Sequence, residues 1–390
     1  MFRVTQHTFL SNIRTQLARG GRHLLTSQEQ VATGRQINHP SDDPSGAFRV
    51  LGLKAVQARN DQYARNLSSV TSRLNVSENV FGQSQEVLYR ALELSIQAAN
   101  GSLDAAQRQV IATEVTQQID EVMRLANSEL GGRYLFGGYQ TDQPPFVRDL
   151  TVAAEAANTG SGTIATGSFD SEAVAGARYR VRFTTAATYE VVEVGTNATT
   201  ATGSYTAGSP IDFDGRGNTV VIGGAPVAGD SFLITPHVVY RGDGNDTRVT
   251  VGEGQTVTAN VHGHQFFLGD TNLDGTTDAG RVSLFGSLEE FKFALENNDQ
   301  SAIQIVIDKV NQAVGQMSEG QGVIGGRLNM VQSAQNDLSQ RAITIEGLRS
   351  QIEDADMATA ITNLSATEAV YQATLGTAAR VLQRSLLDYL

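Results

Sequence analysis

The sequence predicts a mainly α fold with a β-rich insertion, in which both ends of the chain build a long antiparallel helical bundle or coiled coil. The first observation behind this prediction is that apolar residues recur every seven positions in both terminal zones. The second is that the middle zone is rich in glycine and alternates Thr, Val, Tyr and Ala in short runs. Because two similar helical zones flank the β-rich zone, packing the ends together leaves the middle as an outer insertion.

The first helical zone spans about residues 1–140 and contains only Pro40 and Pro44 as breaks. Its apolar rows keep the seven-residue interval on both sides of these prolines, which is typical of helices packed along one seam. The rows are Leu10, Leu17, Leu24 and Val31 with Ile13, then Leu53, Leu67, Leu74, Phe81 and Leu88 with Asn60 in the gap and Val56, Tyr63 and Val70 alongside.

The middle zone, residues 151–280, holds 20 of the 39 glycines, which favours short strands joined by frequent turns. We expect strands at Tyr179–Phe183 and Tyr189–Val194, where β-branched and aromatic residues gather. The zone carries 14 acidic residues and six arginines, so it holds two thirds of the net charge of −12. We therefore expect it to form a solvated outer domain.

Helical spacing returns from about residue 281 to the end of the chain. Its rows are Ile324, Val331, Leu338, Ile345 and Ile352, then Ile361, Leu375, Leu382 and Tyr389 with Leu364, Tyr371 and Ala378 alongside. We predict three domains from these zones. They are a terminal coiled-coil domain of residues 1–40 plus 352–390, a helical rod of residues 41–146 plus 281–351, and a β-rich outer domain of residues 147–280.

The two terminal segments carry opposite charges, since residues 1–35 hold five Arg and one Glu while residues 352–390 hold five acids and two Arg. One interpretation buries their apolar rows inside a single molecule as a helical bundle. A lone helix pair leaves most of each helix exposed, however, and Gly20 and Gly21 each cost about 1 kcal/mol of helix propensity. We therefore expect the ends to become fully ordered only when neighbouring copies cover them. The expected assembly interface is Leu10, Ile13, Leu17, Leu24 and Val31 against Ile361, Leu364, Tyr371, Leu375 and Leu382.

The composition argues against several classes of partner. A net charge of −12 repels phosphate backbones, so we expect no nucleic-acid partner. The chain has no cysteine, which excludes disulfides, thiolate metal sites and thiol nucleophiles. No apolar run approaches the roughly 18 residues that a membrane span requires, and the first 30 residues lack the apolar centre of a cleavable signal. We therefore expect a soluble protein without a membrane partner.

A polar, turn-rich segment, residues 33–46, separates the first two apolar rows. Asp43 suits the N-cap of a helix, and Pro44 suits its first position, where a missing N–H costs nothing. Asp42 and Asp43 could instead form a catalytic carboxylate pair, but the side chains of adjacent residues diverge, which makes that interpretation the weaker one.

This segment resembles the N-terminal motif of bacterial flagellins and hook-associated proteins, in which Gly, Arg, Ile-Asn and Asp-Asp-Pro follow in this order. Further matches are Leu-Ser-Ile-Gln-Ala-Ala-Asn-Gly at residues 94–101 and Ile-Glu-Asp-Ala-Asp-Met-Ala at residues 352–358. The resemblance covers both helical zones and implies a flagellin-like fold. The β-rich zone shows no resemblance that we identify from the sequence.

Residues 127–146 resemble the signature of the members of this superfamily that join hook to filament, which flagellins usually lack. The stretch contains Gly-Gly-Arg-Tyr-Leu-Phe-Gly-Gly at residues 131–138 and then Pro-Pro-Phe. On physical grounds alone, Tyr134, Leu135 and Phe136 between glycine pairs predict an apolar plug where the helix ends.

The resemblance implies a structural protein of the bacterial flagellum, with no enzymatic activity and no cofactor. Such a protein is an adaptor that joins the hook, through the preceding hook-associated protein, to the flagellin filament. Its expected location is extracellular, at the hook–filament junction, after secretion by the flagellar type III export apparatus with an export chaperone. Self-association into a ring is also implied, and a flagellin, the filament subunit, is the close alternative.

Two patterns in the middle zone suggest a metal or ligand site instead. The loop that begins at Asp270 resembles a calcium loop, but Arg281 stands where a bidentate Glu belongs. His262 and His264 would share one face of a strand and could chelate a metal, although we expect two exposed strand histidines. An enzyme or a metal- or carbohydrate-binding domain at residues 151–280 is therefore the alternative from another class.

Overall fold

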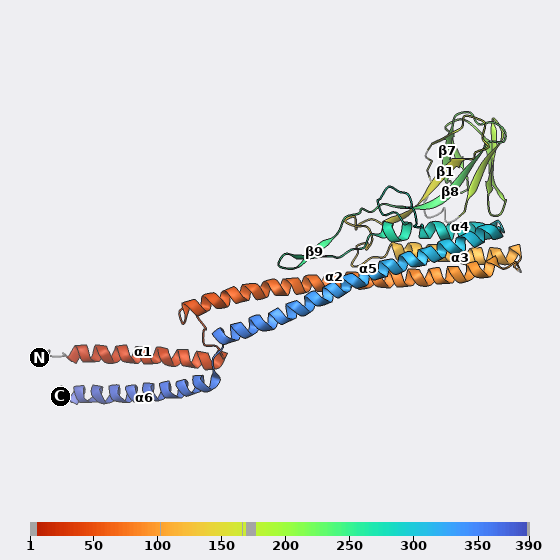
Figure 1. Ribbon diagram of the computed structural model, residues 1–390. Coiled ribbons are helices and arrows are strands. Elements are labelled where there is room, and N and C mark those ends of the chain that lie inside the picture. Colours follow the sequence, from red (N-terminus) through yellow and green to blue (C-terminus); the bar gives the residue numbers. More distant parts are fainter. Residues whose placement is uncertain (1–5, 102, 166, 169–176, 388–390) are drawn as a thin grey trace. The chain divides into compact units, whose positions relative to one another are not determined.

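The computed structural model of the protein describes residues 6–101, 103–165, 167–168 and 177–387. The predicted order of helices, then strands, then helices is confirmed (Figure 1). The helices are α1 (Gln6–Thr33), α2 (Pro44–Ala99), α3 (Ala105–Ala126), α4 (Leu284–Glu296), α5 (Gln300–Glu353), α6 (Met357–Leu387) and a π-helix, η1 (His264–Leu268).

The chain forms two compact units. The first unit joins Met1–Arg65 to Ser333–Leu390, and the second is Asn66–Gln332. Helices α2 and α5 contribute to both units, because each is more than fifty residues long. The three-domain division made from the sequence stays a prediction.

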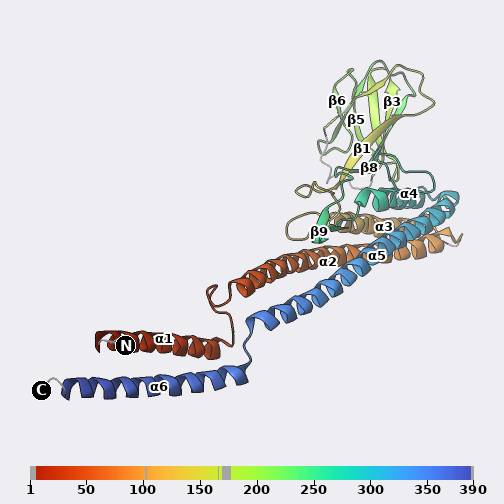
Figure 2. The same cartoon turned by 60° about the vertical axis from the view of Figure 1, so that its left-hand side comes forward.

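In the first unit, segments from the two ends of the chain lie side by side. Helices α1 and α6 run antiparallel (Figures 1 and 2), and side-chain hydrogen bonds from Lys54 and Asn60 join the start of α2 to the end of α5. Asn60, which fills a gap in the predicted apolar row of α2, is buried and donates its Nδ2 hydrogen to the carbonyl oxygen of Leu338 at 2.9 Å. A polar residue at this row position is thus satisfied by the backbone of the facing helix.

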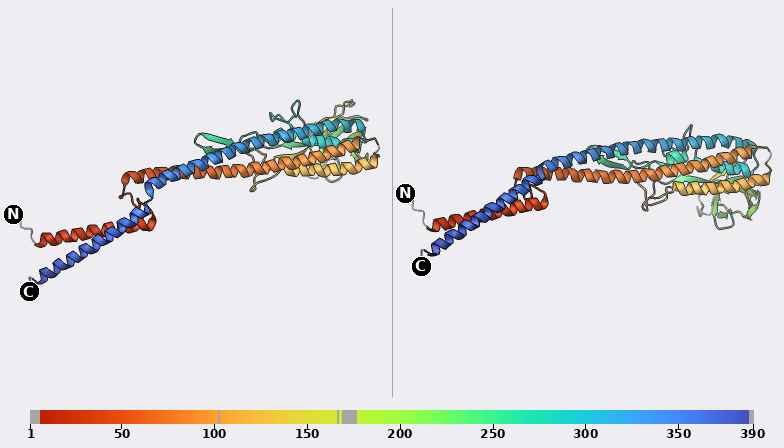
Figure 3. Two further views of the ribbon diagram at one scale, coloured as in Figure 1. Left: turned by 60° about the horizontal axis from the view of Figure 1, so that its bottom comes forward. Right: turned by 90° about the horizontal axis from the view of Figure 1, so that it is seen from below.

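In the second unit, α2 and α5 continue side by side and α3 packs beside them (Figure 3). The predicted rows are confirmed in this part of the rod, since their members are buried there. Gly320 of α5 meets the ring of Phe81, because a Cβ atom at this position would lie 2.1 Å from Phe81 Cε1. The buried row members are Leu67, Leu74, Phe81 and Leu88 of α2 with Ile324 and Val331 of α5.

The β-rich insertion contains a five-stranded sheet in the order β1-β8-β3-β4-β5, a three-stranded sheet in the order β2-β7-β6 and the ribbon β9-β10. Adjacent strands pair antiparallel, and the two sheets share one apolar core that includes Phe183, Phe213 and Phe232. Both strands expected from the sequence are present, as β3 and β4. The strands are β1 (Phe146–Ala154), β2 (Thr163–Ala165), β3 (Tyr179–Thr185), β4 (Thr188–Glu193), β5 (Thr199–Ser204), β6 (Pro210–Asp212), β7 (Thr219–Gly223), β8 (Ser231–Tyr240), β9 (Arg248–Gly252) and β10 (Gln255–Thr258).

One expectation from the apolar pattern needs correction. Val56 was placed in an inward row, but it is exposed; in this part of α2 Val50 and Asn60 are buried and Leu53, Lys54 and Gln57 are half-buried. In the described part of the chain, no helix combines the length and apolar character needed to cross a membrane.

Candidate assembly surface

The contact between α1 and α6 is built from one narrow seam on each helix. On α1 the half-buried side chains include Ile13, Leu17, Leu24 and Val31, as the seven-residue row predicts. On α6 the most buried positions follow at steps of four and three, which is the spacing of a coiled-coil seam. They are Ala360, Leu364, Thr367, Tyr371, Thr374 and Ala378, of which only the two alanines are buried, at 7% and 6% exposure.

The ring of Tyr371 lies on the glycine pair of α1. A Cβ atom at Gly20 would lie 3.3 Å from Tyr371 Cδ2, and one at Gly21 would lie 3.7 Å from Cε2. The two glycines, which the sequence marks only as a cost in helix propensity, therefore make room for an aromatic side chain in the seam.

A second apolar row lies outside this seam. It consists of Ile361 and Leu375, which share one face of α6 and are 50% and 44% exposed. Val370 of α6 and Leu25 of α1 are exposed outside this row. Exposed apolar side chains mark surfaces on which other proteins pack when they gather into a contiguous patch. This outer row is the part of the pair that stays free to contact another molecule.

The structure thus divides the residues predicted for the assembly interface. It brings Leu364 and Tyr371 into the inner seam with the α1 row, and it leaves Ile361 and Leu375 in the outer row. The side chains of Leu10 and Leu382, which were predicted with them, lie outside the described residues.

The segments that leave α1 and enter α6 are tied together by their backbones. The N–H of Gln36 donates to the carbonyl oxygen of Glu353 at 2.7 Å, and the N–H of Ala355 donates to that of Gly34 at 2.9 Å. Arg35 and Asp354 form an isolated antiparallel bridge between these two bonds. The connection between α1 and α2 and the connection between α5 and α6 are therefore bonded to each other, and we call this region the joint.

A buried carboxylate occupies this joint. The side chain of Glu353 is only 5% exposed, and Lys54 Nζ lies 2.8 Å from its Oε1. Arg35 Nη1 lies 3.3 Å from the same oxygen, and Arg349 Nε lies 3.6 Å from the other. One carboxylate thus balances three cations, which come from the α1–α2 connection, α2 and α5. No sequence pattern singled out Glu353, and only its place in the motif at residues 352–358 could have drawn attention to it.

The turn before α2 is held by two neighbouring carboxylates with separate tasks. Asp42 accepts hydrogen bonds from the N–H groups of Asn38 and His39, while Asp43 accepts from the N–H and the hydroxyl of Ser45. The backbone N–H of Gly46, followed by the Ser45 hydroxyl, lowers the pKa of Asp43. The predicted N-cap at Asp43 is confirmed, and the two carboxylates serve different parts of the turn.

In the second unit, the predicted plug is confirmed for Leu135 and Phe136, which are buried, whereas Tyr134 is only half-buried. The ring of Phe136 packs edge to face on Phe81 at a centroid distance of 5.8 Å and on Phe267 at 5.6 Å. The chain that follows α3 is therefore anchored on the rod by aromatic packing.

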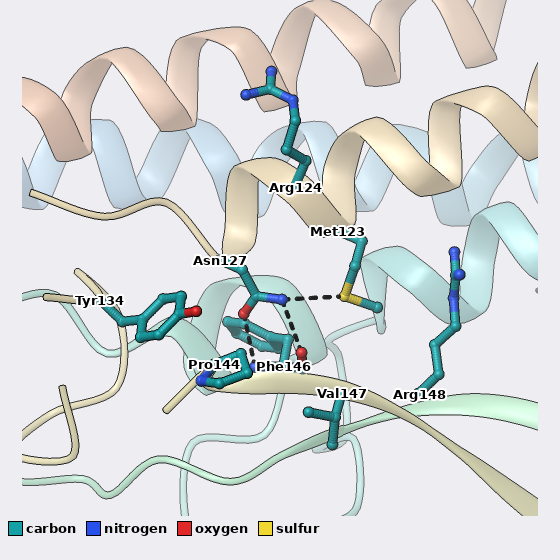
Figure 4. A pocket seen from close by; sticks show the side chains of 8 residues that line it. All are labelled: Met123, Arg124, Asn127, Tyr134, Pro144, Phe146, Val147 and Arg148. Atoms are coloured by element: carbon teal, nitrogen blue, oxygen red, sulfur yellow. Dashed lines mark hydrogen bonds between the residues drawn. The ribbon is translucent and has the colours of Figure 1, made fainter. Parts of the chain in front are cut away.

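A cavity of about 370 Å³ lies beside this anchor (Figure 4). Within it, Asn127 Nδ2 donates to the carbonyl oxygen of Phe146 at 2.8 Å, and the N–H of Phe146 donates to Asn127 Oδ1 at 3.0 Å. Arg148 pairs with Asp120. The carboxamide of Asn127 thus fixes the start of β1. The lining residues are Met123, Arg124, Asn127, Tyr134, Pro144, Phe146, Val147 and Arg148.

Helix α4 carries a carboxyl group with an unusual proton affinity. Burial raises the pKa of Glu289 to about 7, although the positive charges of Arg178, Arg148 and Lys292 act in the opposite direction. The guanidinium of Arg178 in turn lies 4.0 Å from the ring centroid of Phe293. We therefore expect the carboxyl of Glu289 to change its protonation near neutral pH.

The residues of the two suspected metal sites make hydrogen bonds and ion pairs within the chain. In the loop that begins at Asp270, this carboxylate accepts the N–H groups of Asn272, Leu273 and Gly275, and Arg281 pairs with Glu319. Among the described residues, no group of three or more His, Cys, Asp or Glu side chains is placed to hold a metal ion.

The expectation of two exposed strand histidines is wrong. His264 is buried at the start of η1 and its ring stacks on that of His262 at 5.7 Å, while His262 is half-buried and 3.3 Å from Asp246. The alternation that suggested a strand ends before these residues, because β10 stops at Thr258 and a π-helical turn follows.

Known families match three parts of the chain. The bacterial flagellin N-terminal helical region matches residues 4–141, and the bacterial flagellin C-terminal helical region matches residues 307–390. These two matches together cover more than half of the chain, and the chain belongs to the flagellin superfamily. Residues 153–236 match the D2-like domain of flagellar hook-associated protein 1, which corrects the expectation that the β-rich zone has no identifiable resemblance.

Individual relatives come from two branches of this superfamily. Flagellar hook-associated protein 3 of Salmonella typhimurium is 39% identical over 119 residues, which are 30% of this chain and 38% of that protein. Flagellin B of Vibrio anguillarum is 26% identical over 368 residues, which are 92% of this chain and 90% of that protein. The match to hook-associated protein 3 therefore spans well under half of that relative.

Among solved structures, a candidate flagellar hook-associated protein from Vibrio parahaemolyticus has a TM-score of 0.53 at 15% identity. The similarity covers 80% of this chain and 100% of that chain. At this identity the likeness concerns the fold, in which long terminal helices flank an outer insertion.

Proposed function

We propose that the protein is a structural subunit of the extracellular bacterial flagellum and joins the hook to the flagellin filament. The observation that carries this proposal is the 39% identity over 119 residues to a hook-associated protein 3, against 35% over 115 residues for a flagellin. In this role the protein is an adaptor without enzymatic activity.

The assembly surface supports this proposal. The α1–α6 pair buries only a narrow seam, and its outer row exposes Ile361 and Leu375. Burying apolar area at about 25 cal/mol per Å² favours a neighbouring subunit on this face. The joint around Glu353 supports such a contact, because its ion pairs and backbone hydrogen bonds restrict the movement of α1 and α6 at the joint.

The partners proposed for this adaptor follow from its position between two unlike structures. They are further copies of the chain in a ring, the preceding hook-associated protein on one side, and flagellin on the other. Secretion by the type III export apparatus with an export chaperone belongs to the same proposal.

Complementation tests the proposal. Expressed in a strain that lacks its own junction protein, the chain should restore retention of filaments and swimming, whereas variants without residues 1–35 or 352–390 should fold as soluble proteins and fail to restore either. Normal swimming with such a truncated variant would contradict the adaptor role.

Flagellin is the second candidate, because the similarity to Flagellin B covers 92% of the chain. The same strains separate the two functions. A junction protein restores filament retention without itself polymerising, whereas a flagellin forms long filaments when it is the only filament subunit expressed. Long filaments made of this chain alone would replace the proposed function with the alternative.

A further inference from the structure

Helices α2 and α3 enclose a groove that neither the joint nor the outer row uses. The groove has a volume of about 390 Å³ and is lined by residues of both helices, including Glu86, Glu114, Gln118 and Glu121. Val87 contributes the apolar part of the lining. The groove lies wholly within the second unit, on the surface of the rod.

Gln118 is the unusual residue of this groove. It is 8% exposed, yet neither its Nε2 nor its Oε1 has a hydrogen-bond partner among the described residues. Nearly all buried polar groups in native proteins are hydrogen-bonded, because leaving one unpaired costs free energy without any return within the chain. Leucine or methionine would fill the same helical position at lower cost. A buried carboxamide without a partner is therefore expected where a partner arrives from another molecule.

The charges around Gln118 indicate the chemistry of that partner. Arg90 forms an ion pair with Glu114, in which Nε lies 2.7 Å from Oε1, and a second ion pair with Glu93. Arg124 forms an ion pair with Glu121. The hydrogen bond from Arg124 lowers the pKa of Glu121, so this carboxyl is ionised at neutral pH. The lining holds three glutamates, Glu86, Glu114 and Glu121, and one arginine, Arg90, so it carries an excess of negative charge.

Among the described residues Glu86 has no ion-pair partner, unlike Glu114 and Glu121, the other two glutamates of the lining. It is exposed at the edge of the groove, on the helix that faces Gln118. Since Glu86 accepts hydrogen bonds and Gln118 Oε1 also accepts, a group with several N–H donors and a positive charge satisfies both. A guanidinium group has five such donors in a planar fork, whereas an ammonium group is a compact, strongly hydrated charge.

We propose that the α2–α3 groove binds the guanidinium group of an arginine side chain presented by a neighbouring protein subunit, with Glu86 and Gln118 as its acceptors. Binding requires the carboxamide of Gln118 to rotate toward the incoming group, so that its Oε1 gains a hydrogen bond that it lacks in the free chain. The site is independent of the outer row on α6, so it stands even if the proposed junction role does not.

The test uses the full chain with selectively ¹⁵N-labelled glutamine and N-acetyl-arginine amide as the probe. The side-chain NH₂ resonance of Gln118, assigned by its loss in Gln118→Met, should shift in a saturable way. Glu86→Gln should weaken binding about tenfold or more, because a charge-assisted hydrogen bond is lost. The matched control is Glu78→Gln, an exposed glutamate of α2 outside the groove, which should bind like the parent.

N-acetyl-citrulline amide has nearly the same shape as the probe but no charge, and it should not bind. Equal shifts with both amides, or no shift with either, would overturn the proposal.

Stability gives a second readout: Gln118→Met should raise the midpoint of thermal unfolding by a few degrees while binding is lost. Gln117→Met, an exposed residue of the same lining, should change neither. A lower midpoint in Gln118→Met would show that the carboxamide has a partner within the chain and would also overturn the inference.

The source of the arginine is read from sedimentation of the full chain. If the probe dissociates oligomers of the chain, the arginine belongs to a second copy. If self-association is unchanged while the probe binds, the arginine belongs to another protein. Complementation of swimming is a separate measurement, so failure of the groove and failure of the junction role are distinguishable.

Discussion

Replacing Glu353 with glutamine should loosen the joint between the terminal helices and the rod. The substitution keeps the size of the side chain and the backbone bonds from Gln36, and it removes the charge that Lys54, Arg35 and Arg349 share. Breaking a buried ion pair by removing one partner costs about 3–5 kcal/mol. The side chains of Arg35 and Lys54 are 48% and 40% exposed, so water screens part of this interaction. We therefore expect a loss of about 1–3 kcal/mol in the free energy of opening.

Amide hydrogen exchange of peptides from residues 11–33 and 357–380 measures this opening directly. Glu346→Gln is the control, because Glu346 pairs with the same Arg349 on the same helix but is half-exposed. Loss of the Glu346–Arg349 ion pair should lower the free energy of opening by no more than about 0.5 kcal/mol. Equal exchange in the two variants would refute the argument that the buried charge stabilises the joint.

The remaining predictions concern the α6 rows, the carboxyl of α4 and the acidic loop. Leu364→Ala should accelerate amide exchange in α1 and α6 of the monomer, whereas Ile361→Ala should leave exchange unchanged and weaken self-association measured by sedimentation, since only Leu364 lies in the inner seam. For Glu289, the folded pKa of about 7 lies above the ordinary value of 4.5. The folded state therefore binds more protons between these values, and stability should fall as pH rises from about 4.5 to 7. Glu289→Gln should flatten this part of the profile in denaturant titrations and stabilise the protein at pH 8, and an unchanged profile would count against the burial argument. Calcium or zinc should leave the midpoint of thermal unfolding unchanged, whereas a rise would favour a metal-binding role for the loop at Asp270.

Several parts of the fold could be predicted because they depend on short-range periodicity. The rows through Leu67 and Ile324 keep a fixed interval within one helix, and the buried stripe follows that interval. The strands β3 and β4 were predictable from alternating β-branched and aromatic residues. The N-cap at Asp43 was predictable because capping involves only the next few residues.

The functional surface could be predicted only in part. The sequence of α6 contains two parallel seven-residue rows, through Leu364 and through Ile361, and periodicity alone does not decide which one faces α1. The glycines opposite Tyr371 decide it, and that contact joins residues 350 positions apart in the chain.

The joint at Glu353 was missed for a related reason. Its three cations stand at positions 35, 54 and 349, and each of them alone resembles an ordinary solvated charge. His264 was placed wrongly because a π-helical turn has no periodic signal in a stretch of five residues.

The position of Tyr371 on Gly20 and Gly21 has a consequence for the alignment of the two terminal helices. A coiled coil with regular rows can slip by one heptad and still match apolar residues to apolar residues. Here such a slip would set the ring against Ile13 and Arg14 or against Ser27 and Gln28, where side chains fill the space that the glycines leave empty. The helix pair therefore has one register, and the outer apolar row of α6 lies at the same position along α1 in every molecule.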